Sequence, residues 1–318
     1  MLAHNSPLYQ RLFAWIQERF PLANALLFFI LYLLAAFIGR FSQTPDAIVI
    51  SLQDVVGCGV TWSFFLLLRI LDEHKDYALD VQNHPERVLQ SGLITLQHLK
   101  ILGVIAVILQ LAWSLFLDQG FASVTQAWLI LMAWTFLMTV EFFCGEWLSQ
   151  RLTLYAFSHM LVMPLVLWWL MQMGQPHAPL GSLFVWVAAL AFSGGLTFEI
   201  TRKTRGPEEE RETVDSYSQQ FGVMGASMIV LLLLTLMFGL QLVILDRVTT
   251  TPFWLGIVSL SVLFLVGVWR LLVFMRAPSK KGRSINEAIV GVVMLGGNGF
   301  IIAAILWGRG VDFSVWGV

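Results

Sequence analysis

The stretch that decides the fold runs from Ala47 to Asp80 and reads AIVISLQDVVGCGVTWSFFLLLRILDEHKDYALD. Its first part, up to Leu71, is long and apolar enough to cross a bilayer core as a helix, because about 20 residues that rise about 1.5 Å each span about 30 Å. Its last part carries carboxylates at Asp72, Asp76 and Asp80. We therefore expect a membrane-spanning helix that ends in an acidic segment.

The same apolar pattern recurs through the sequence. Of the 318 residues, 58% are hydrophobic and only 12% are charged, and the mean hydropathy is +0.76. A soluble domain carries about 25% charged residues, so this composition excludes a soluble globular protein. No Gly/Ser linker divides the chain, and we expect one all-α integral membrane domain, residues 1–318, of about nine transmembrane helices in one bundle. The expected spans run from Pro21 to Gly39, Ala47 to Leu71, Ile101 to Leu117, Ala122 to Val140, Leu152 to Met173, Leu180 to Phe198, Val223 to Leu245, Pro252 to Val268 and Ala288 to Trp307.

The basic residues predict the orientation. With a cytoplasmic amino terminus, alternation of the spans places all but three of the 19 Lys and Arg residues on the cytoplasmic side, the exceptions being Arg40, Arg247 and Arg309. This is the positive-inside pattern. We therefore expect a multi-pass protein of a bacterial inner (plasma) membrane, in contact with membrane lipid, whose amino terminus and two charged segments are cytoplasmic. The formal net charge of −1 argues against nucleic acid as a partner, because such a surface needs an excess of basic residues.

Three carboxylates stand at helical spacing after the second span. Asp72, Asp76 and Asp80 are four residues apart and therefore share one face of a helix. Like charges at this spacing repel unless a cation lies between them, and oxygen ligands without cysteine suit Mg²⁺. The turn that follows holds Arg87, whose planar guanidinium suits phosphate oxygens. The plainer interpretation is a solvated helix end in which Lys75 pairs with a neighbouring acid.

A second charged segment, Glu199 to Asp215, follows the sixth span and interleaves acidic and basic side chains. Because both segments are expected on the same membrane face, their carboxylates could meet at a shared metal and diphosphate group, with the bases neutralising its remaining charge. Taken alone, the segment is typical of a solvated loop. Its glutamates are Glu199, Glu208, Glu209, Glu210 and Glu212.

These residues resemble the motifs of a divergent member of the UbiA superfamily of intramembrane prenyltransferases. The family's first motif, Asn-Asp-x-x-Asp-x-x-x-Asp, is followed by a His-Pro-x-Arg-like turn and a Gly-x-x-Thr segment. The matching positions here are Asp72, Asp76, Asp80, Arg87, Gly92 and Thr95. Leu71 stands in place of the Asn, and the first two acids are four residues apart rather than three. The second motif matches loosely, through Ser216 to Gly222, with Glu where the family has Asp.

The resemblance covers nearly the whole chain and implies nine helices around a central cavity. It implies an enzyme, a prenyltransferase that uses Mg²⁺ to move a prenyl group from an isoprenyl diphosphate to a lipophilic, most simply aromatic, acceptor within the membrane. The catalytic residues it implies are Asp72, Asp76, Asp80 and Glu199, and the metal ligands are the same four with Glu209. The residues that would hold the diphosphate are Lys75, Arg87, Arg202 and Lys203.

Polar residues in or beside the apolar spans are further candidates, because an unpaired charge in hydrocarbon is unfavourable and often functional. Glu141, Glu146 and His159 could bind the acceptor or act as its general base, and imidazole titrates near neutrality. The plainer interpretation of each is an interhelical hydrogen bond that fixes packing.

Two other functions stay open at the level of sequence. An intramembrane terpene cyclase would ionise a prenyl diphosphate without an acceptor, and the altered motifs are compatible with it. A non-enzymatic transporter or lipid-binding membrane protein would use Asp54, which precedes Asp72 by 18 residues, in an ion path.

Overall fold

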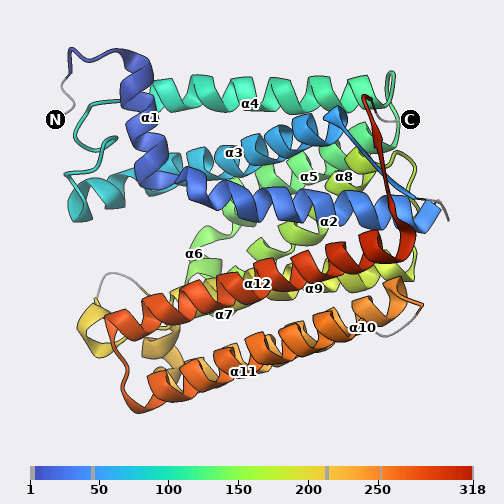
Figure 1. Ribbon diagram of the computed structural model, residues 1–318. Coiled ribbons are helices and arrows are strands. Elements are labelled where there is room, and N and C mark those ends of the chain that lie inside the picture. Colours follow the sequence, from blue (N-terminus) through green and yellow to red (C-terminus); the bar gives the residue numbers. More distant parts are fainter. Residues whose placement is uncertain (1–3, 44–46, 212–214, 251–252, 317–318) are drawn as a thin grey trace.

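The structure is a computed structural model that describes residues 4–43, 47–211, 215–250 and 253–316. Long helices run side by side through most of the molecule, and the short helix α1 lies across their ends (Figure 1). The helices are α1 (Leu8–Arg19), α2 (Ala25–Gln43), α3 (Leu52–Asn83), α4 (Leu96–Leu117), α5 (Ser123–Thr139), α6 (Gly145–Ser149), α7 (Leu152–Met160), α8 (Val162–Gly174), α9 (Ser182–Arg202), α10 (Tyr217–Val248), α11 (Trp254–Arg276) and α12 (Lys280–Arg309). The other elements are the 3₁₀ turns η1 (Leu22–Asn24), η2 (Glu141–Phe143) and η3 (Pro207–Glu209) and the strands β1 (Ile48–Ser51) and β2 (Val311–Ser314).

The predicted spans form helices that pack as one bundle. Within the described residues, eight helical segments are long and apolar enough to cross a membrane, and α5, with 17 residues, is a shorter apolar helix in the place of the predicted fourth span. Neighbouring helices pack in pairs, with α9 against α10, α2 against α8 and α11 against α12. The predicted all-α membrane bundle is therefore confirmed.

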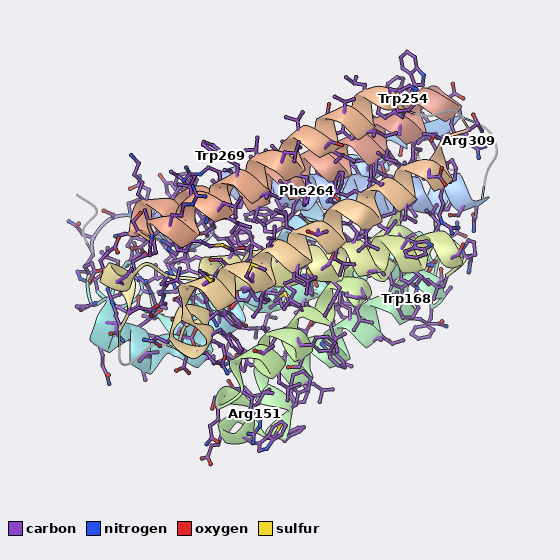
Figure 2. The ribbon with its side chains drawn as sticks, turned by 90° about the horizontal axis from the view of Figure 1, so that it is seen from below. Arg151, Trp168, Trp254, Phe264, Trp269 and Arg309 are labelled. Atoms are coloured by element: carbon purple, nitrogen blue, oxygen red, sulfur yellow. The ribbon has the colours of Figure 1, made fainter. Side chains whose placement is uncertain are left out.

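The outer surface of the bundle is apolar. Trp254 and Trp269 of α11 point away from the other helices (Figure 2), and their exposed fractions are 67% and 59%. Leu255 and Leu265 of the same helix are also exposed. A wide apolar surface of this kind is stable against lipid chains rather than against water.

Three details differ from the predicted spans. Residues 48–51 were expected to begin the second helix, but they form β1, which pairs in parallel with β2, and α3 starts at Leu52. Three consecutive β-branched side chains favour this extended backbone. The fifth span is divided at Leu161 into α7 and α8. Helix α10 starts at Tyr217, earlier than predicted, and is interrupted at Gly222, where φ is 70° and ψ is 162°.

The two ends of the bundle differ in chemistry. At the end that we call the charged end, α3 and α9 finish and α10 and α12 begin, with α1 across it (Figure 1). At the opposite end, Arg40 and Asp54 form a buried ion pair in which Nη2 and Oδ1 are 2.7 Å apart. The Tyr32 hydroxyl donates to Asp54, and Arg40 donates to the carbonyl oxygens of Val49 and Gly174. These contacts tie α2, α3, α8 and β1 together.

Candidate active site

The first charged segment lies on about the last three turns of α3. This helix has 32 residues and is about 48 Å long, so its turns after Leu71 extend beyond its apolar part. Asp72 and Asp76 are exposed there, and neither forms an ion pair or hydrogen bond with a residue that the structure describes. These two carboxylates are therefore available to a ligand.

The surrounding protein alters the titration of these two groups. Loss of hydration raises the pKa of Asp72, an effect that nearby Arg69 opposes and the charge of Asp76 reinforces. Loss of hydration also raises the pKa of Asp76, where Lys75 opposes the shift and Asp80 reinforces it. A nearby cation would thus stabilise the ionised form of both carboxylates, because it would offset the repulsion between their negative charges.

The other acidic side chains of the segment are paired with arginines. Asp80 lies 2.8 Å from Arg87 and 3.4 Å from Arg19. Glu73 has a fully buried side chain and lies 2.6 Å from Arg19 and 2.5 Å from Arg69. Arg87, predicted to hold a diphosphate, is therefore held by Asp80 in this structure, and Asp80, predicted to bind metal, is neutralised by two guanidinium groups.

Helix α1 delivers Arg19 to this cluster. Its apolar residues Leu12, Trp15 and Ile16 lie on one face and belong to a hydrophobic cluster that includes Leu66 and Ile70 of α3. Trp15 is fully buried. The arginine stands on the last turn, beyond this apolar face. Sequence reasoning missed Arg19, and the signal that could have found it was the amphipathic spacing of these three residues.

The second charged segment begins within α9 and continues into the loop before α10. Glu199, on the last turn of α9, lies 2.7 Å from Arg202 and 2.9 Å from Lys203. Glu209, on η3, lies 3.0 Å from Arg283 of α12. Glu199 is thus neutralised by the two bases predicted to hold a diphosphate, and Glu209 ties its loop to another helix. The metal-binding roles of both glutamates stay predictions.

Tyr155 of α7 is the point where the two charged segments meet. The Lys75 ammonium nitrogen lies 5.0 Å from the centre of its ring, and that of Lys203 lies 5.9 Å from it. Lys75 also donates a hydrogen bond to the Tyr155 hydroxyl. Arg202 is near enough to Asp72 for their charges to interact. Sequence reasoning did not identify Tyr155, because nothing in its own span marks it as a neighbour of both lysines.

A strained turn brings Glu141 next to Lys75, the lysine that contacts Tyr155. Its carboxylate lies 2.5 Å from the Lys75 ammonium nitrogen. Residues 141–143 have φ values of 48°, 53° and 58°, all in the left-handed region. Each costs about 1–2 kcal/mol for a residue other than glycine, and such strain clusters at functional sites. The turn therefore holds Glu141 in place at a measurable cost in stability.

His159 lies directly beside Tyr155. The two rings stack with their centres 3.9 Å apart, and His159 Nδ1 donates to the Tyr155 carbonyl oxygen at 2.8 Å. Because a carbonyl oxygen only accepts, the proton of the neutral imidazole lies on Nδ1 and Nε2 is an acceptor. Nε2 is buried and has no partner among the described residues. Glu146, the third predicted acceptor or base candidate, is exposed on α6 and makes no ion pair within that part of the chain.

The donor set fits a cation that needs few protein ligands. In the described ranges, no three His, Cys, Asp or Glu side chains converge on one point. Asp72 and Asp76 supply two unpaired carboxylates, and Mg²⁺ is commonly held by one or two carboxylates with water and substrate phosphate completing its shell. Asp72 and Asp76 therefore fit Mg²⁺ better than the three paired acids of the predicted set.

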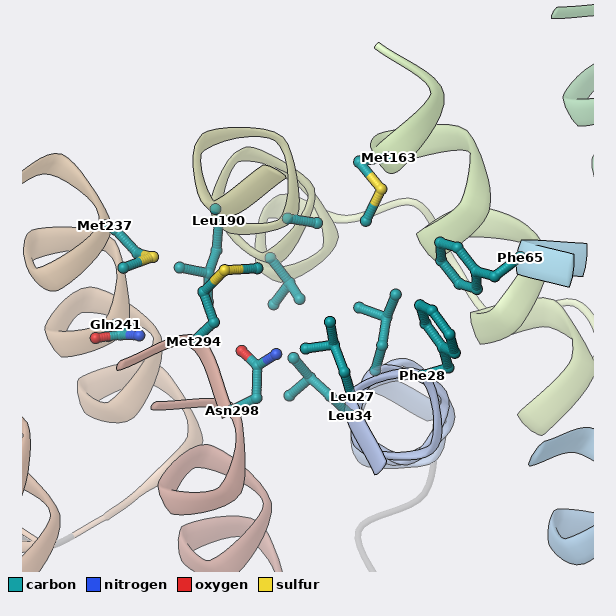
Figure 3. Close-up of a pocket in the computed structure, with 14 residues that line it drawn as sticks. Leu27, Phe28, Leu34, Phe65, Met163, Leu190, Met237, Gln241, Met294 and Asn298 are labelled. Atoms are coloured by element: carbon teal, nitrogen blue, oxygen red, sulfur yellow. The ribbon is translucent and has the colours of Figure 1, made fainter. Parts of the chain in front are cut away.

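An apolar cavity lies between the helices of the bundle (Figure 3). It lies between α2, α3, α8, α9, α10 and α12, and its volume, counted as the space that the centre of a water molecule can reach, is about 60 Å³. Phe65, which lines it, precedes Asp72 by seven residues, so this wall lies about 10 Å along α3 from the carboxylates. The cavity is thus a narrow hydrocarbon slot beneath the charged group.

The fold has a solved counterpart. A structure of digeranylgeranylglyceryl phosphate synthase, an enzyme studied in membranes, superposes with a TM-score of 0.62 over 94% of this chain and 99% of that one, with 17% sequence identity. No family model matches the chain, and no curated protein matches it in sequence. The likeness is therefore one of fold.

Proposed function

We propose that this protein is an intramembrane prenyltransferase that moves a prenyl group from an isoprenyl diphosphate to a lipophilic, aromatic acceptor with Mg²⁺ as cofactor. The proposal rests on two neighbouring carboxylates, Asp72 and Asp76, that have no ion-pair partner among the described residues. They lie among lysine and arginine side chains, above the apolar slot. The shared fold supports it, because the solved counterpart is digeranylgeranylglyceryl phosphate synthase, whose named product carries geranylgeranyl groups.

The residues of the charged end would act on the diphosphate. Asp72 and Asp76 would hold Mg²⁺, which when bound supplies positive charge to the departing diphosphate. Lys75, Arg202 and Lys203 would neutralise its remaining oxygens, and Arg87 would join them if the diphosphate replaced Asp80 as its partner. Positive groups held in place before the reaction stabilise the leaving group without reorganisation.

The bond that breaks joins the first prenyl carbon to a diphosphate oxygen, and its electron pair leaves with the diphosphate. The apolar slot would receive the prenyl chain and keep water from the resulting allylic cation. The acceptor then forms the new bond and loses a proton. His159 Nε2, or the Glu141 carboxylate once released from Lys75, would take that proton.

On this proposal the charged end faces the cytoplasm of a bacterium, as the distribution of basic residues predicts. Arg40, Arg247 and Arg309, the three basic residues expected on the other side, stand on the final turns of α2, α10 and α12. These turns are at the end of the bundle away from Asp72.

The test compares Asp76→Asn with Glu86→Gln in purified full-length protein given isoprenyl diphosphates, candidate aromatic acceptors and Mg²⁺. We expect Mg²⁺-dependent release of diphosphate and a prenylated product from the wild type, and a loss of about a hundredfold in rate in Asp76→Asn. Glu86 is the matched control, because its side chain is 71% exposed in the turn that follows the motif. Full activity in Asp76→Asn, or no Mg²⁺-dependent release at all, would reject the proposal. A cyclic product formed without acceptor would favour the terpene cyclase.

A further inference from the structure

The lining of the apolar cavity includes an uncharged polar side chain that makes no hydrogen bond within the described part of the chain. Asn298 of α12 lines the cavity, is 9% exposed, and makes no hydrogen bond with any described residue. Figure 3 shows its amide between Met294 and the side chains of Leu27 and Leu34 of α2. An amide in hydrocarbon surroundings that lacks a partner is destabilising, so a group that pairs with it is expected to bind there.

This amide lies deep in the bundle. Asn298 follows Lys280 by 18 residues and precedes Arg309 by 11, which places it about 27 Å and about 17 Å from the two ends of α12. It is therefore well separated from the charged end. A prenyl chain is pure hydrocarbon and would leave the amide unpaired.

A second amide beside it already has a fixed partner. Gln241 of α10 is 1% exposed, and its Nε2 donates to the Val293 carbonyl oxygen at 3.3 Å. A Cβ atom on Gly297 would lie 1.9 Å from this Nε2, so the glycine makes room for the Gln241 amide. The Gln241 Nε2 is thus fixed between α10 and α12, and its buried Oε1 has no partner among the described residues and can only accept. Asn298 is the amide in the lining whose donor and acceptor are both without a partner in that part of the chain.

The chemistry of the slot restricts that ligand. Its lining has no charged side chain among the described residues, so an ionised group would be excluded. The Asn298 amide offers both a donor and an acceptor, and a hydroxyl both donates and accepts, whereas an ether or a carbonyl oxygen only accepts. We propose that, when no prenyl diphosphate is bound, the cavity holds a neutral lipophilic alcohol whose hydroxyl pairs with Asn298.

The test measures binding of farnesol and of farnesyl methyl ether to the full-length protein in nanodiscs, without Mg²⁺ or any diphosphate. The two probes share one hydrocarbon chain and differ in the hydroxyl proton. We expect the wild type to bind the alcohol roughly fivefold more tightly, the value of about one net hydrogen bond. Because no reaction takes place, this result is independent of the proposed transfer.

Two variants assign the preference to the amide. Asn298→Leu keeps the number and branching of the side-chain heavy atoms, removes an unpaired polar group and is expected to fold at least as stably. It should bind alcohol and ether equally. Met294→Leu, the matched control in the same lining, should change the affinity for both probes by the same factor. Equal binding of the two probes to the wild type, as expected if a water molecule alone pairs with Asn298, or a preference that survives in Asn298→Leu, would overturn the proposal.

Discussion

Asp76 and Asp80 lie about one turn apart on α3 and yet have different neighbours. Asp80 is neutralised by guanidinium groups from α1 and from the turn after α3, whereas Asp76 has no ion pair with a described residue. The identity of the residue is the same, so the difference comes from the helices around it. A carboxylate with an arginine partner stabilises the fold, and a carboxylate without one is available for ligand binding.

Glu73 should control the acid stability of the charged end. Burial alone would raise its pKa, but Arg69 and Arg19 outweigh that effect and hold the pKa below its usual value of 4.5. A carboxyl with a lowered folded pKa contributes stability above the unfolded value, and that stability is lost as the pH falls toward the folded pKa. In Glu73→Gln we expect about 3 kcal/mol less free energy of unfolding at pH 7, because two arginines lose their partner.

The measurement is thermal unfolding of the detergent-solubilised protein from pH 7 down to about pH 2, because the loss begins near the usual pKa of 4.5 and is complete only below the lowered folded pKa. The wild-type midpoint should fall on acidification and approach that of Glu73→Gln, whose own curve should be flatter. Glu86→Gln, which alters an exposed carboxylate, serves as the control and should follow the wild type. A constant difference between wild type and Glu73→Gln across this pH range would contradict the assignment.

At the scale of elements, the interruption of α10 depends on one residue, Gly222. Gly222 combines a φ of 70° with a ψ of 162°, a region that is essentially restricted to glycine. We expect Gly222→Ala to lower the free energy of unfolding by about 1–3 kcal/mol. Gly239→Ala is the matched control, since Gly239 lies within the same helix and a Cβ there meets no atom within 4 Å. That variant should be neutral or more stable by up to about 1 kcal/mol. Equal thermal midpoints for the two variants would contradict this account of the interruption.

The loop between α9 and α10 is expected to depend on its contacts with α12. Glu209 pairs with Arg283, and the neighbouring Glu208 accepts a hydrogen bond from the Lys280 backbone amide at 2.5 Å. In Glu209→Gln the ion pair is lost, and limited trypsin digestion should cleave after the exposed Arg211 several-fold faster, because a protease needs the backbone around its site to open locally and the lost contact makes that opening more frequent. An unchanged cleavage rate, together with weaker Mg²⁺ binding, would instead support the predicted role of Glu209 as a metal ligand.

Sequence predicted the spans because each is a long apolar run, and membrane crossing depends mainly on length and hydrophobicity. It predicted the helical stripe of Asp72, Asp76 and Asp80, because that pattern is local to one helix. It did not predict that Arg19 pairs with Asp80, or that Tyr155 lies between two lysines, because such partners come from other helices. Strand β1 was also missed, since three apolar residues before a helix have the same hydrophobicity in either conformation.

At the scale of the whole molecule, charge is divided between two ends with different roles. The charged end combines unpaired carboxylates, a strained turn and several cations, and it lies above a slot. At the opposite end, Arg40 and Asp54 satisfy one another within a compact network. Such a pair is suited to joining helices. Both carboxylate oxygens of Asp54 already accept hydrogen bonds, so neither is left over to bind an ion. The two readings of Asp54 predict different behaviour when it is changed.

If the pair joins helices, removing one member leaves the other without its ionic partner in a buried site. Asp54→Asn and Arg40→Met should then each lower the free energy of unfolding by about 3 kcal/mol, and the double variant should lose clearly less than the sum, because neither charge is then left alone. Thermal unfolding of the four proteins completes this cycle. If Asp54 instead carries ions, Asp54→Asn should leave stability nearly unchanged and abolish ion flux in proteoliposomes. A coupling free energy near zero between the two substitutions would therefore contradict the structural role of the pair. It would favour the hypothesis that Asp54 takes part in transport.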